Sequence, residues 1–347
     1  MIYDVFQCSR RIGPTCFGTR GTDCRERGPT SRSDPPLNPR DTVDGPSRPH
    51  VLTPLDLSLA LRLRSAFGAD GDAFVRSFRD RLDEARTRWG LDVGAPWSAS
   101  YGFVAPARRS DVGTVDGADV VLKLRVPNDD ARAEVAALRC YDGRGAVRLL
   151  DATHDGGALL LQRASPGTDL RDLDDALATR IAAGVAQRLQ TIALPNPSYP
   201  FPTVEDWAAG FARSGLKFDA IRQAERFFKE LCATSAQPVL LHGDLHHSNI
   251  VADGEDWLAI DPQGVLGEPL LELTAFMRNP YPVPAAPHAV EERTARRLEI
   301  LSAEWGLDAE RLHAWTYAQT VLSACWVAED GGDPRSELEL AERIGRP

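Results

Sequence analysis

The chain has 347 residues, of which 43% are hydrophobic, and its formal net charge is −10. This length and composition allow one large domain or two lobes with their own cores. The acidic balance argues against nucleic-acid binding by the whole chain, because neutralising phosphates requires a basic face. No apolar run is long enough to cross a membrane, no apolar signal segment is visible and the six cysteines form no CxxC pair, so we expect a cytoplasmic protein with free thiols.

Residues 1–50 are rich in Arg, Pro, Gly, Ser and Thr and contain few large aliphatic side chains. A core cannot be built from this composition, so we expect a disordered leader. Apolar residues then recur at helical spacing between residues 53 and 90, which predicts a pair of helices that ends at Gly90.

The segment from residue 97 to residue 126 is typical of β-structure. A first strand is expected at Ser100–Val104 and a second at Asp119–Val126. Alternation in the second strand places Lys123 on the face opposite to that of its apolar neighbours. The intervening segment Ala105–Asp116 is expected to be a loop, and it contains no GxGxxG motif.

A short amphipathic helix is predicted at residues 129–141, and Glu134 lies on it. Two more strands are expected at 147–150 and 158–162, and the second of them runs into Ser165-Pro166-Gly167, a sequence typical of a hinge between two lobes. Helical periodicity then predicts helices at 172–192, 203–235 and 287–346.

The most informative stretch lies in the second half of the chain. Val239–Leu241 predicts a buried strand, and two apolar runs around Asp253-Gly254 predict a β-hairpin whose loop is longer than two residues. The open end of that hairpin would bring Asn249 and Asp261 side by side, and Asp244 lies in the loop that leads into it. Two carboxylates and one amide would converge there, a set of hard oxygen ligands that suits Mg²⁺ better than zinc.

The residues HGDLHHSN at His242–Asn249, followed by Ile260-Asp261-Pro262, resemble the catalytic and metal loops of the aminoglycoside phosphotransferase family. The pattern H-x-D-x-x-x-x-N and a later Asp is also that of protein kinases. Gly243 in place of Arg, and Asp-Pro in place of Asp-Phe-Gly, resemble the small-molecule branch, and the sequence after Asp261 is similar to the streptomycin 6-kinase and hydroxyurea phosphotransferase subgroup.

This resemblance implies an α+β, protein-kinase-like fold with a small β-rich N-terminal lobe and a larger helical C-terminal lobe. We expect the lobes at 51–163 and 164–347. Asp244 would orient the acceptor hydroxyl and accept its proton, while Asn249 and Asp261 would hold Mg²⁺.

The same resemblance implies an ATP site. Lys123 would bind the α- and β-phosphates, and Glu134 would hold this lysine in place. The carbonyl of Gln162 and the amide of Ala164 would hold the adenine at the hinge. Each assignment has an alternative. Lys123 could be a solvated strand lysine, and Glu134 could be a surface glutamate, with Asp129 or Asp130 in its place. The hinge could be a plain interdomain linker.

The implied reaction is transfer of the γ-phosphoryl group of ATP to a hydroxyl of an aminocyclitol antibiotic such as streptomycin, which would confer resistance by O-phosphorylation. Hydroxyurea, choline, homoserine and sugars are alternative acceptors that the loop motif does not separate. A cationic acceptor suits an acidic chain. Glu268 and Glu272 would contribute to its pocket, or would instead anchor the helix that follows them.

A different class of function would use some of the same residues. A histidine-rich loop with aspartates is typical of metal-dependent hydrolases. The candidate ligands for such a dinuclear site are His242, Asp244, His246, His247 and Asp261. The hydrolase hypothesis leaves Asn249, Lys123 and the hinge unexplained. A third possibility is a kinase-like binding module without activity. The complete set of kinase-type residues argues against this possibility.

Overall fold

The computed structural model describes residues 55–109, 119–192, 199–235, 237–280, 286 and 288–347. The described residues belong to one compact unit. The leader predicted at residues 1–50 lies outside the described residues, and the lobe boundary at residue 163 stays a prediction. No helix in the described part of the chain is both long and apolar enough to span a bilayer.

The first helix, α1 (Leu57–Trp89), is a pair of helical segments, as predicted. The break lies at Gly68, whose φ of 55° and ψ of −124° are not helical. Gly90 ends the helix in the left-handed conformation and donates its N–H to Arg86 O, which confirms the predicted stop. Phe78 contacts Phe103 edge to face with 5.2 Å between ring centroids, so α1 packs on the sheet that follows.

Five of the described strands form one antiparallel sheet in the order β1-β2-β3-β5-β4. Their bounds are Leu91–Val93 (β1), Gly102–Arg109 (β2), Asp119–Arg125 (β3), Leu149–Ala152 (β4) and Ala158–Gln162 (β5). The prediction of a loop at Ala105–Asp116 is wrong for its first residues, because Ala105 and Ala107 are buried members of β2. Strand β1 was not expected from the sequence. It is only three residues long, which is too short for a period-2 pattern to be recognised.

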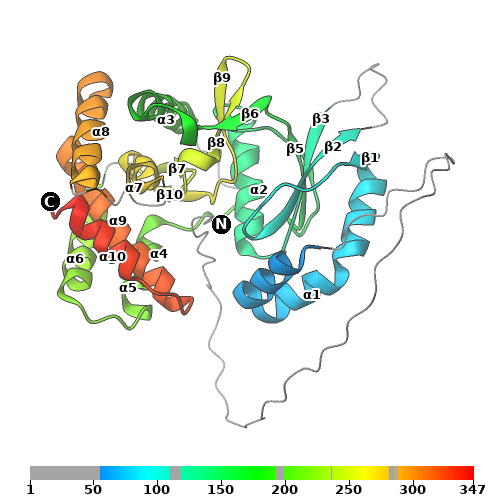
Figure 1. Ribbon diagram of the computed structural model, residues 1–347, viewed down its shortest axis with the longest axis horizontal. Coiled ribbons are helices and arrows are strands. Elements are labelled where there is room, and N and C mark those ends of the chain that lie inside the picture. The colour runs from blue at the N-terminus through cyan, green and yellow to red at the C-terminus, as the bar shows by residue number, and fades with distance from the viewer. Residues whose placement is uncertain (1–54, 110–118, 193–198, 236, 281–285, 287) are drawn as a thin grey trace, which may run out of the picture. The chain divides into compact units, whose positions relative to one another are not determined.

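Helix α2 (Asp129–Tyr141) packs against one face of this sheet. Asn128 caps its start by accepting a hydrogen bond from the Ala131 N–H, as expected of a helix N-cap. Figure 1 shows α2 between the sheet and the helical remainder of the chain. Its buried residues Leu138 and Tyr141 share a core with Leu159 and Leu161 of β5, and that core continues into the helical part.

The helical part is built around α9, which is buried along most of its length. The bounds of the α-helices are Asp175–Gln190 (α3), Val204–Trp207 (α4), Ala209–Arg213 (α5), Asp219–Ala233 (α6), Thr274–Arg278 (α7), Ala289–Trp305 (α8), Ala309–Glu329 (α9) and Arg335–Ile344 (α10). Short 3-10 helices lie at Leu170–Asp172 (η1), His247–Asn249 (η2) and Pro269–Leu273 (η3). Figure 1 shows α6, α8, α9 and α10 together on the side away from the sheet.

Two small sheets connect the sheet-rich and helical parts. One contains β6 (Pro166–Asp169), β8 (Ile250–Asp253) and β9 (Asp256–Ala259), and the other pairs β7 (Val239–Leu241) with β10 (Val265–Gly267). The β8–β9 pair confirms the predicted hairpin, although Asp253 pairs with Asp256 and its turn therefore has only two residues. The expected linker at Ser165-Pro166-Gly167 is in part a strand, because Pro166 begins β6 and pairs with Asp253.

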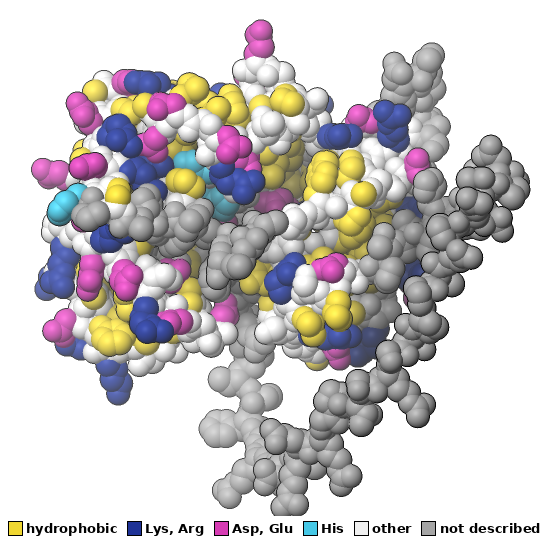
Figure 2. Space-filling view, in the orientation of Figure 1, with side chains coloured by type: hydrophobic (Ala, Val, Ile, Leu, Met, Phe, Trp, Pro, Cys, Tyr) yellow, Lys and Arg dark blue, Asp and Glu magenta, His cyan; other side chains and the backbone are white. Residues whose placement is uncertain are grey.

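Acidic and basic side chains are interspersed over the face of the molecule in Figure 2, and histidine side chains show near its middle.

Candidate active site

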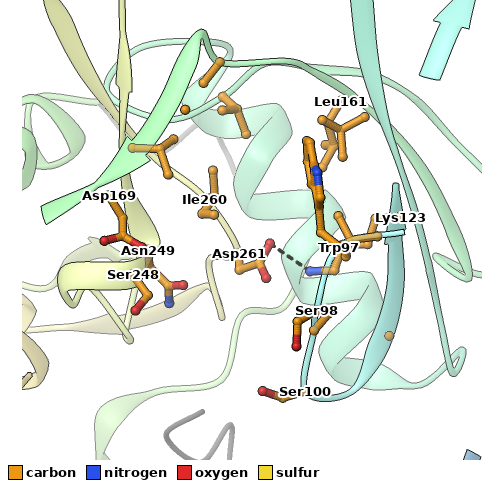
Figure 3. A pocket seen from close by; sticks show the side chains of 18 of the residues that line it. Trp97, Ser98, Ser100, Lys123, Leu161, Asp169, Ser248, Asn249, Ile260 and Asp261 are labelled. Carbon is orange, nitrogen blue, oxygen red and sulfur yellow. Dashed lines mark ion pairs between the residues drawn. The ribbon is translucent and has the colours of Figure 1, made fainter. Parts of the chain in front are cut away.

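A cavity of about 670 Å³ is lined by the five-stranded sheet on one side and by the hairpin region on the other. Its walls include the segment Trp97–Gly102, the cavity-facing side of β3, the end of β5, β6 and the 3-10 helix η2. Figure 3 shows side chains from both sides pointing into this space. The volume is in the range of sites that bind cofactors and drug-sized ligands.

The structure places Lys123 and Glu134 in direct contact. Lys123 Nζ lies 2.8 Å from Glu134 Oε1, and the two side chains are 7% and 1% exposed. Alternation along β3 turns Lys123 toward the cavity, while α2 presents Glu134 from behind the strand. Glu134 is therefore the carboxylate at this lysine, rather than Asp129 or Asp130.

Asp261 completes this group from the opposite side. Its Oδ1 lies 3.0 Å from Lys123 Nζ, as the dashed line in Figure 3 marks. Removal from water tends to raise the pKa of Asp261, but the charges of Lys123 and Arg125 outweigh this effect and hold the pKa below its ordinary value. Asp261 is therefore ionised at neutral pH and faces the cavity as a carboxylate.

Asn249 lies on the same wall as Asp261. The Ile260 N–H donates to Asn249 O at 2.9 Å, so Asn249 is opposite Ile260 and one position removed from the predicted pairing with Asp261. The Asn249 side chain donates through Nδ2 to Asp244 O at 2.9 Å, which leaves its amide oxygen as an acceptor. Asn249 and Asp261 both line the cavity (Figure 3).

Asp244 is buried in the loop between β7 and η2. Its Oδ2 lies 3.7 Å from His246 Nε2, and its backbone carbonyl holds Asn249. His246 and Asn249 line the cavity, and the Asp244 side chain is buried next to His246. The loop thus connects the three predicted catalytic and metal residues through short contacts.

His242 supports the backbone of this loop. Its Nε2–H donates to Ile260 O at 2.7 Å, and its Nδ1 accepts the Asp244 N–H at 3.2 Å. Burial lowers the pKa of His242 to about 4, so the ring is neutral at pH 7. Gly243 has a φ of 82°, and a Cβ there would lie 2.9 Å from Val265 Cγ1, so a larger residue would disturb the loop.

Glu272 and Glu268 are structural anchors and do not line the cavity. Glu272 accepts the N–H groups of His242 and Gly243 at 2.7 and 3.1 Å. Glu268 accepts from Arg311 Nη2 at 2.6 Å and Trp315 Nε1 at 2.9 Å. The hypothesis that these glutamates contribute to a pocket for a cationic acceptor is therefore wrong. The alternative, that they anchor the helix after them, is not what these contacts show: Glu272 holds the loop at His242, and Glu268 holds α9.

The predicted hinge residues Gln162 and Ala164 also line the cavity. The side-chain amide of Gln162 donates to Asp253 Oδ2 at 2.9 Å, and the Ser165 N–H donates to Asp253 Oδ1 at 3.1 Å. Asp253 of β8 therefore fixes the backbone of the hinge. The use of the Gln162 carbonyl and the Ala164 amide for adenine stays a prediction.

Sequence reasoning missed the segment Trp97–Gly102, which covers one end of the cavity. Arg62 of α1 donates to its backbone, through Nε to Ser100 O and through Nη2 to Ala99 O, both at 3.1 Å. This segment connects β1 to β2. Small residues between two short strands, Ser98-Ala99-Ser100 followed by Gly102, were the available sequence signal.

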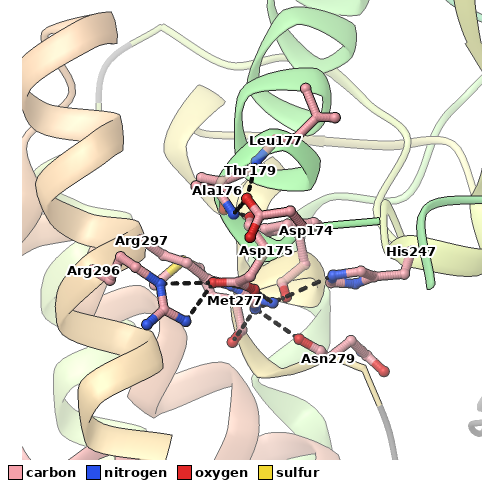
Figure 4. Close-up of polar contacts among 11 residues, drawn as sticks. Asp174, Asp175, Ala176, Leu177, Thr179, His247, Met277, Asn279, Arg296 and Arg297 are labelled. Carbon is pink, nitrogen blue, oxygen red and sulfur yellow. Dashed lines mark hydrogen bonds and ion pairs between the residues drawn. The ribbon is translucent and has the colours of Figure 1, made fainter. Parts of the chain in front are cut away.

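A buried polar network holds the other side of the loop (Figure 4). Arg297 of α8 is fully buried and donates to Asp175 Oδ1 through Nε at 2.9 Å and through Nη2 at 2.5 Å. Its Nη1 donates to Asn279 O at 2.6 Å, and its Nη2 lies 3.3 Å from His247 Nε2. His247 in turn stacks on Phe276 with 4.2 Å between ring centroids. Arg297 therefore connects three separate segments to η2.

Residues 99–331 match the family of aminoglycoside/hydroxyurea antibiotic resistance kinases. The chain belongs to this kinase family. Its sequence is 35% identical over 288 residues to a hydroxyurea phosphotransferase of Kitasatospora aureofaciens, covering 79% of this chain and 80% of that protein. It is 30% identical over 298 residues to a streptomycin 6-kinase of Streptomyces glaucescens, covering 82% of this chain and 95% of that protein.

The fold of this family member is similar to that of solved relatives. A thermostable mutant of the aminoglycoside phosphotransferase APH(4)-Ia aligns with a TM-score of 0.54 at 17% identity, over 76% of this chain and 96% of that chain. The predicted α+β, protein-kinase-like fold with a β-rich and a helical lobe is thereby confirmed. The membership confirms the predicted family and subgroup and makes the chain a phosphotransferase.

The hydrolase hypothesis does not fit the observed loop. His242 and His247 use their ring nitrogens or ring faces in the structural contacts described above. Among the described residues, no three His, Cys, Asp or Glu side chains are grouped so that they could hold a metal ion.

Proposed function

We propose that this kinase transfers the γ-phosphoryl group of ATP to a hydroxyl of an aminocyclitol antibiotic such as streptomycin. The observation that carries the proposal is the cavity wall that holds Lys123, Asp261 and Asn249, with Glu134 paired to Lys123 and the Asp244 backbone bonded to Asn249. Phosphoryl transfer needs little covalent help from a protein, and it depends on positioning and on charge neutralisation. This arrangement offers both.

Each predicted residue has a role in the proposal. Lys123, held by Glu134, binds the inner phosphates of ATP. Asp244 orients the acceptor hydroxyl and accepts its proton as the new oxygen–phosphorus bond forms. The main chain at Gln162 and Ala164 binds the adenine.

Asn249 and Asp261 would hold Mg²⁺. The ionised Asp261 and the acceptor oxygen of the Asn249 amide are hard oxygen donors on one wall of the cavity, which fits the preference of Mg²⁺ for a few such ligands together with phosphate oxygens. When bound, the ion neutralises part of the charge on the phosphates.

Hydroxyurea is the second candidate acceptor. The 35% identity to a hydroxyurea phosphotransferase favours it, since this identity exceeds the 30% to the streptomycin 6-kinase of Streptomyces glaucescens. The cavity walls also carry more basic than acidic side chains, four against two: Lys123, Arg125, Arg163 and Arg171 against Asp169 and Asp261. A neutral acceptor is compatible with this balance, whereas the proposed cationic acceptor needs Asp169 or Asp244 nearby.

A coupled assay of ADP release tests the proposal. The wild-type enzyme is supplied with ATP, Mg²⁺ and either streptomycin, hydroxyurea, choline, homoserine or a sugar. We expect acceptor-dependent ADP release with streptomycin or hydroxyurea. Release with choline alone would assign a different acceptor, and no release with any acceptor, together with no nucleotide binding, would refute the proposed activity.

A further inference from the structure

We propose that Arg125 is a second polyphosphate-binding cation of this site, placed beyond Lys123 toward the terminal phosphate of the nucleotide. This inference rests on the proposed function, because it requires a nucleotide in the cavity. Three observations support it: the position of Arg125 along β3, its contact with Glu134, and its place in the wall of the cavity.

The position of Arg125 follows from the register of the sheet. Val120 pairs with Gln162 at the hinge, Lys123 pairs with Val104, and Arg125 pairs with Gly102 at the start of β2. The order along β3 is therefore the hinge end first, then Lys123, then Arg125. A nucleotide with its base at the hinge and its inner phosphates at Lys123 extends its outer phosphates toward Arg125.

The spacing of the two cations suits this direction. Lys123 and Arg125 are two residues apart on one strand, so their side chains leave the same face. Two residues of a strand span about 6.6 Å, so a phosphate chain that begins at Lys123 comes within reach of the longer arginine side chain. The segment Trp97–Gly102 lines the cavity and enters β2 opposite Arg125, so it covers the same end.

Glu134 holds the two cations beside each other. Its Oε1 accepts from Lys123 Nζ at 2.8 Å, and its Oε2 accepts from Arg125 Nη1. The carboxylate is 1% exposed, whereas the Arg125 side chain is 14% exposed and lines the cavity. A guanidinium presents five donors in a rigid fork, so the contact through Nη1 leaves donors that can reach phosphate oxygens.

Neutralisation of Glu134 alone would be a different role for Arg125. An arginine that only balances a buried carboxylate acts through Glu134 and Lys123, so its loss would weaken ADP binding and ATP binding by the same factor, because both nucleotides carry the inner phosphates. An arginine that contacts the outer phosphates distinguishes these nucleotides, because its loss weakens the binding of ATP most and the binding of AMP least. The two roles are therefore separated by the dependence on phosphate number.

The test compares AMP, ADP and ATP binding in the presence of Mg²⁺, by calorimetry, for the wild type, R125M and R108M. Arg108 is a matched control, since it also belongs to this sheet but its side chain is 74% exposed. We expect R125M to weaken ATP binding by roughly ten- to hundred-fold, ADP binding by less, and AMP binding little, as one lost charge-assisted hydrogen-bond donor implies. R108M should bind all three as the wild type does.

An equal loss of ADP binding and ATP binding in R125M, or no loss of either, would overturn the inference and leave the proposed function standing. If the wild type itself binds no nucleotide, the proposed function fails and the inference fails with it. If circular dichroism shows that R125M is unfolded, R125Q takes its place, because it keeps a hydrogen-bond donor beside Glu134. For R125Q, a loss that is larger for ATP than for ADP supports the inference, and an equal loss overturns it.

Discussion

Lys123 and Glu134 form an ion pair that joins β3 to α2, with 2.8 Å between Nζ and Oε1. A second contact of 3.0 Å joins Lys123 to Asp261 on the far side of the cavity. Glu134 also pairs with Arg125, so two cations and two carboxylates form one continuous network that fixes the position of Lys123 in the site.

Replacement of Lys123 by Met should weaken ATP binding by tenfold or more, on the order expected for a lost charge-assisted contact. Calorimetric titration with ATP and Mg²⁺ measures this loss. Lys229→Met is the matched control, since Lys229 also pairs with a glutamate, Glu225, but is 63% exposed on α6. ATP binding by Lys123→Met at the wild-type affinity would contradict the role of this lysine.

Replacement of Asp244 by Asn should lower kcat by roughly 10²- to 10⁴-fold, because the acceptor hydroxyl loses its proton acceptor. The affinity for ATP should change little, since Asp244 is assigned to the acceptor hydroxyl and not to the nucleotide. Steady-state kinetics with a saturating acceptor, together with a melting curve, separates lost catalysis from lost folding. Full activity of Asp244→Ala would contradict the catalytic role of Asp244.

Asp261→Asn and Asn249→Ala should raise the Mg²⁺ concentration needed for half-maximal activity. Asn is chosen at residue 261 because the φ of Asp261 is 60°, a conformation that Asn adopts more readily than most residues. Activity measured over a series of Mg²⁺ concentrations reports the effect. Wild-type Mg²⁺ dependence in both variants would show that the ion is held elsewhere.

Arg297→Met should destabilise the protein by about 3 kcal/mol, because the buried carbonyl of Asn279 loses its donor and Asp175 keeps only the exposed Arg296 as a partner. Urea unfolding measures the change in the free energy of unfolding. Arg180→Met is the control, because Arg180 also forms a double contact with a carboxylate, Glu304, but at 46% exposure, where such a pair contributes about 0–1 kcal/mol. Equal effects of the two substitutions would show that the Arg297 network is not a buried anchor of the loop.

Stability should depend on pH through Glu272. Burial raises the pKa of this carboxyl to about 7 from an ordinary value of 4.5, so the folded state holds its proton where the unfolded state has lost it. The stabilisation is therefore complete below about pH 4.5 and is lost as the pH rises to about 7. In urea unfolding at a series of pH values, the wild type should lose stability relative to Glu272→Gln across this window, and parallel curves would contradict the expectation.

Much of the site could be predicted because its residues are close in sequence or lie on regular elements. The segment His242–Asn249 and Asp261 are joined by one hairpin, and Lys123 follows from the period of a strand. The exact pairing could not be predicted to the residue, because the turn at Gly254 is shorter than expected and moves Asn249 opposite Ile260.

Other features depend on contacts between distant segments, which one sequence does not reveal. Arg297 contacts Asp175 and His247 across 122 and 50 positions of the chain. The helical period of residues 172–192 places Leu177 in line with Val185 and Leu189 of the core, but Leu177 is 46% exposed, because the helix turns a neighbouring face toward the interior. The covering segment Trp97–Gly102 was missed because β1 is too short to show a pattern.

The most direct test of the central claim is mass spectrometry of the acceptor after incubation with the enzyme, ATP and Mg²⁺. Streptomycin and hydroxyurea are supplied separately, and the wild type is compared with Asp244→Asn. We expect one phosphoryl group on one of these acceptors, formed in step with ADP by the wild type and almost absent with the variant. Release of the phosphoryl group as free phosphate with both acceptors unmodified, at the same rate in both proteins, would contradict the account.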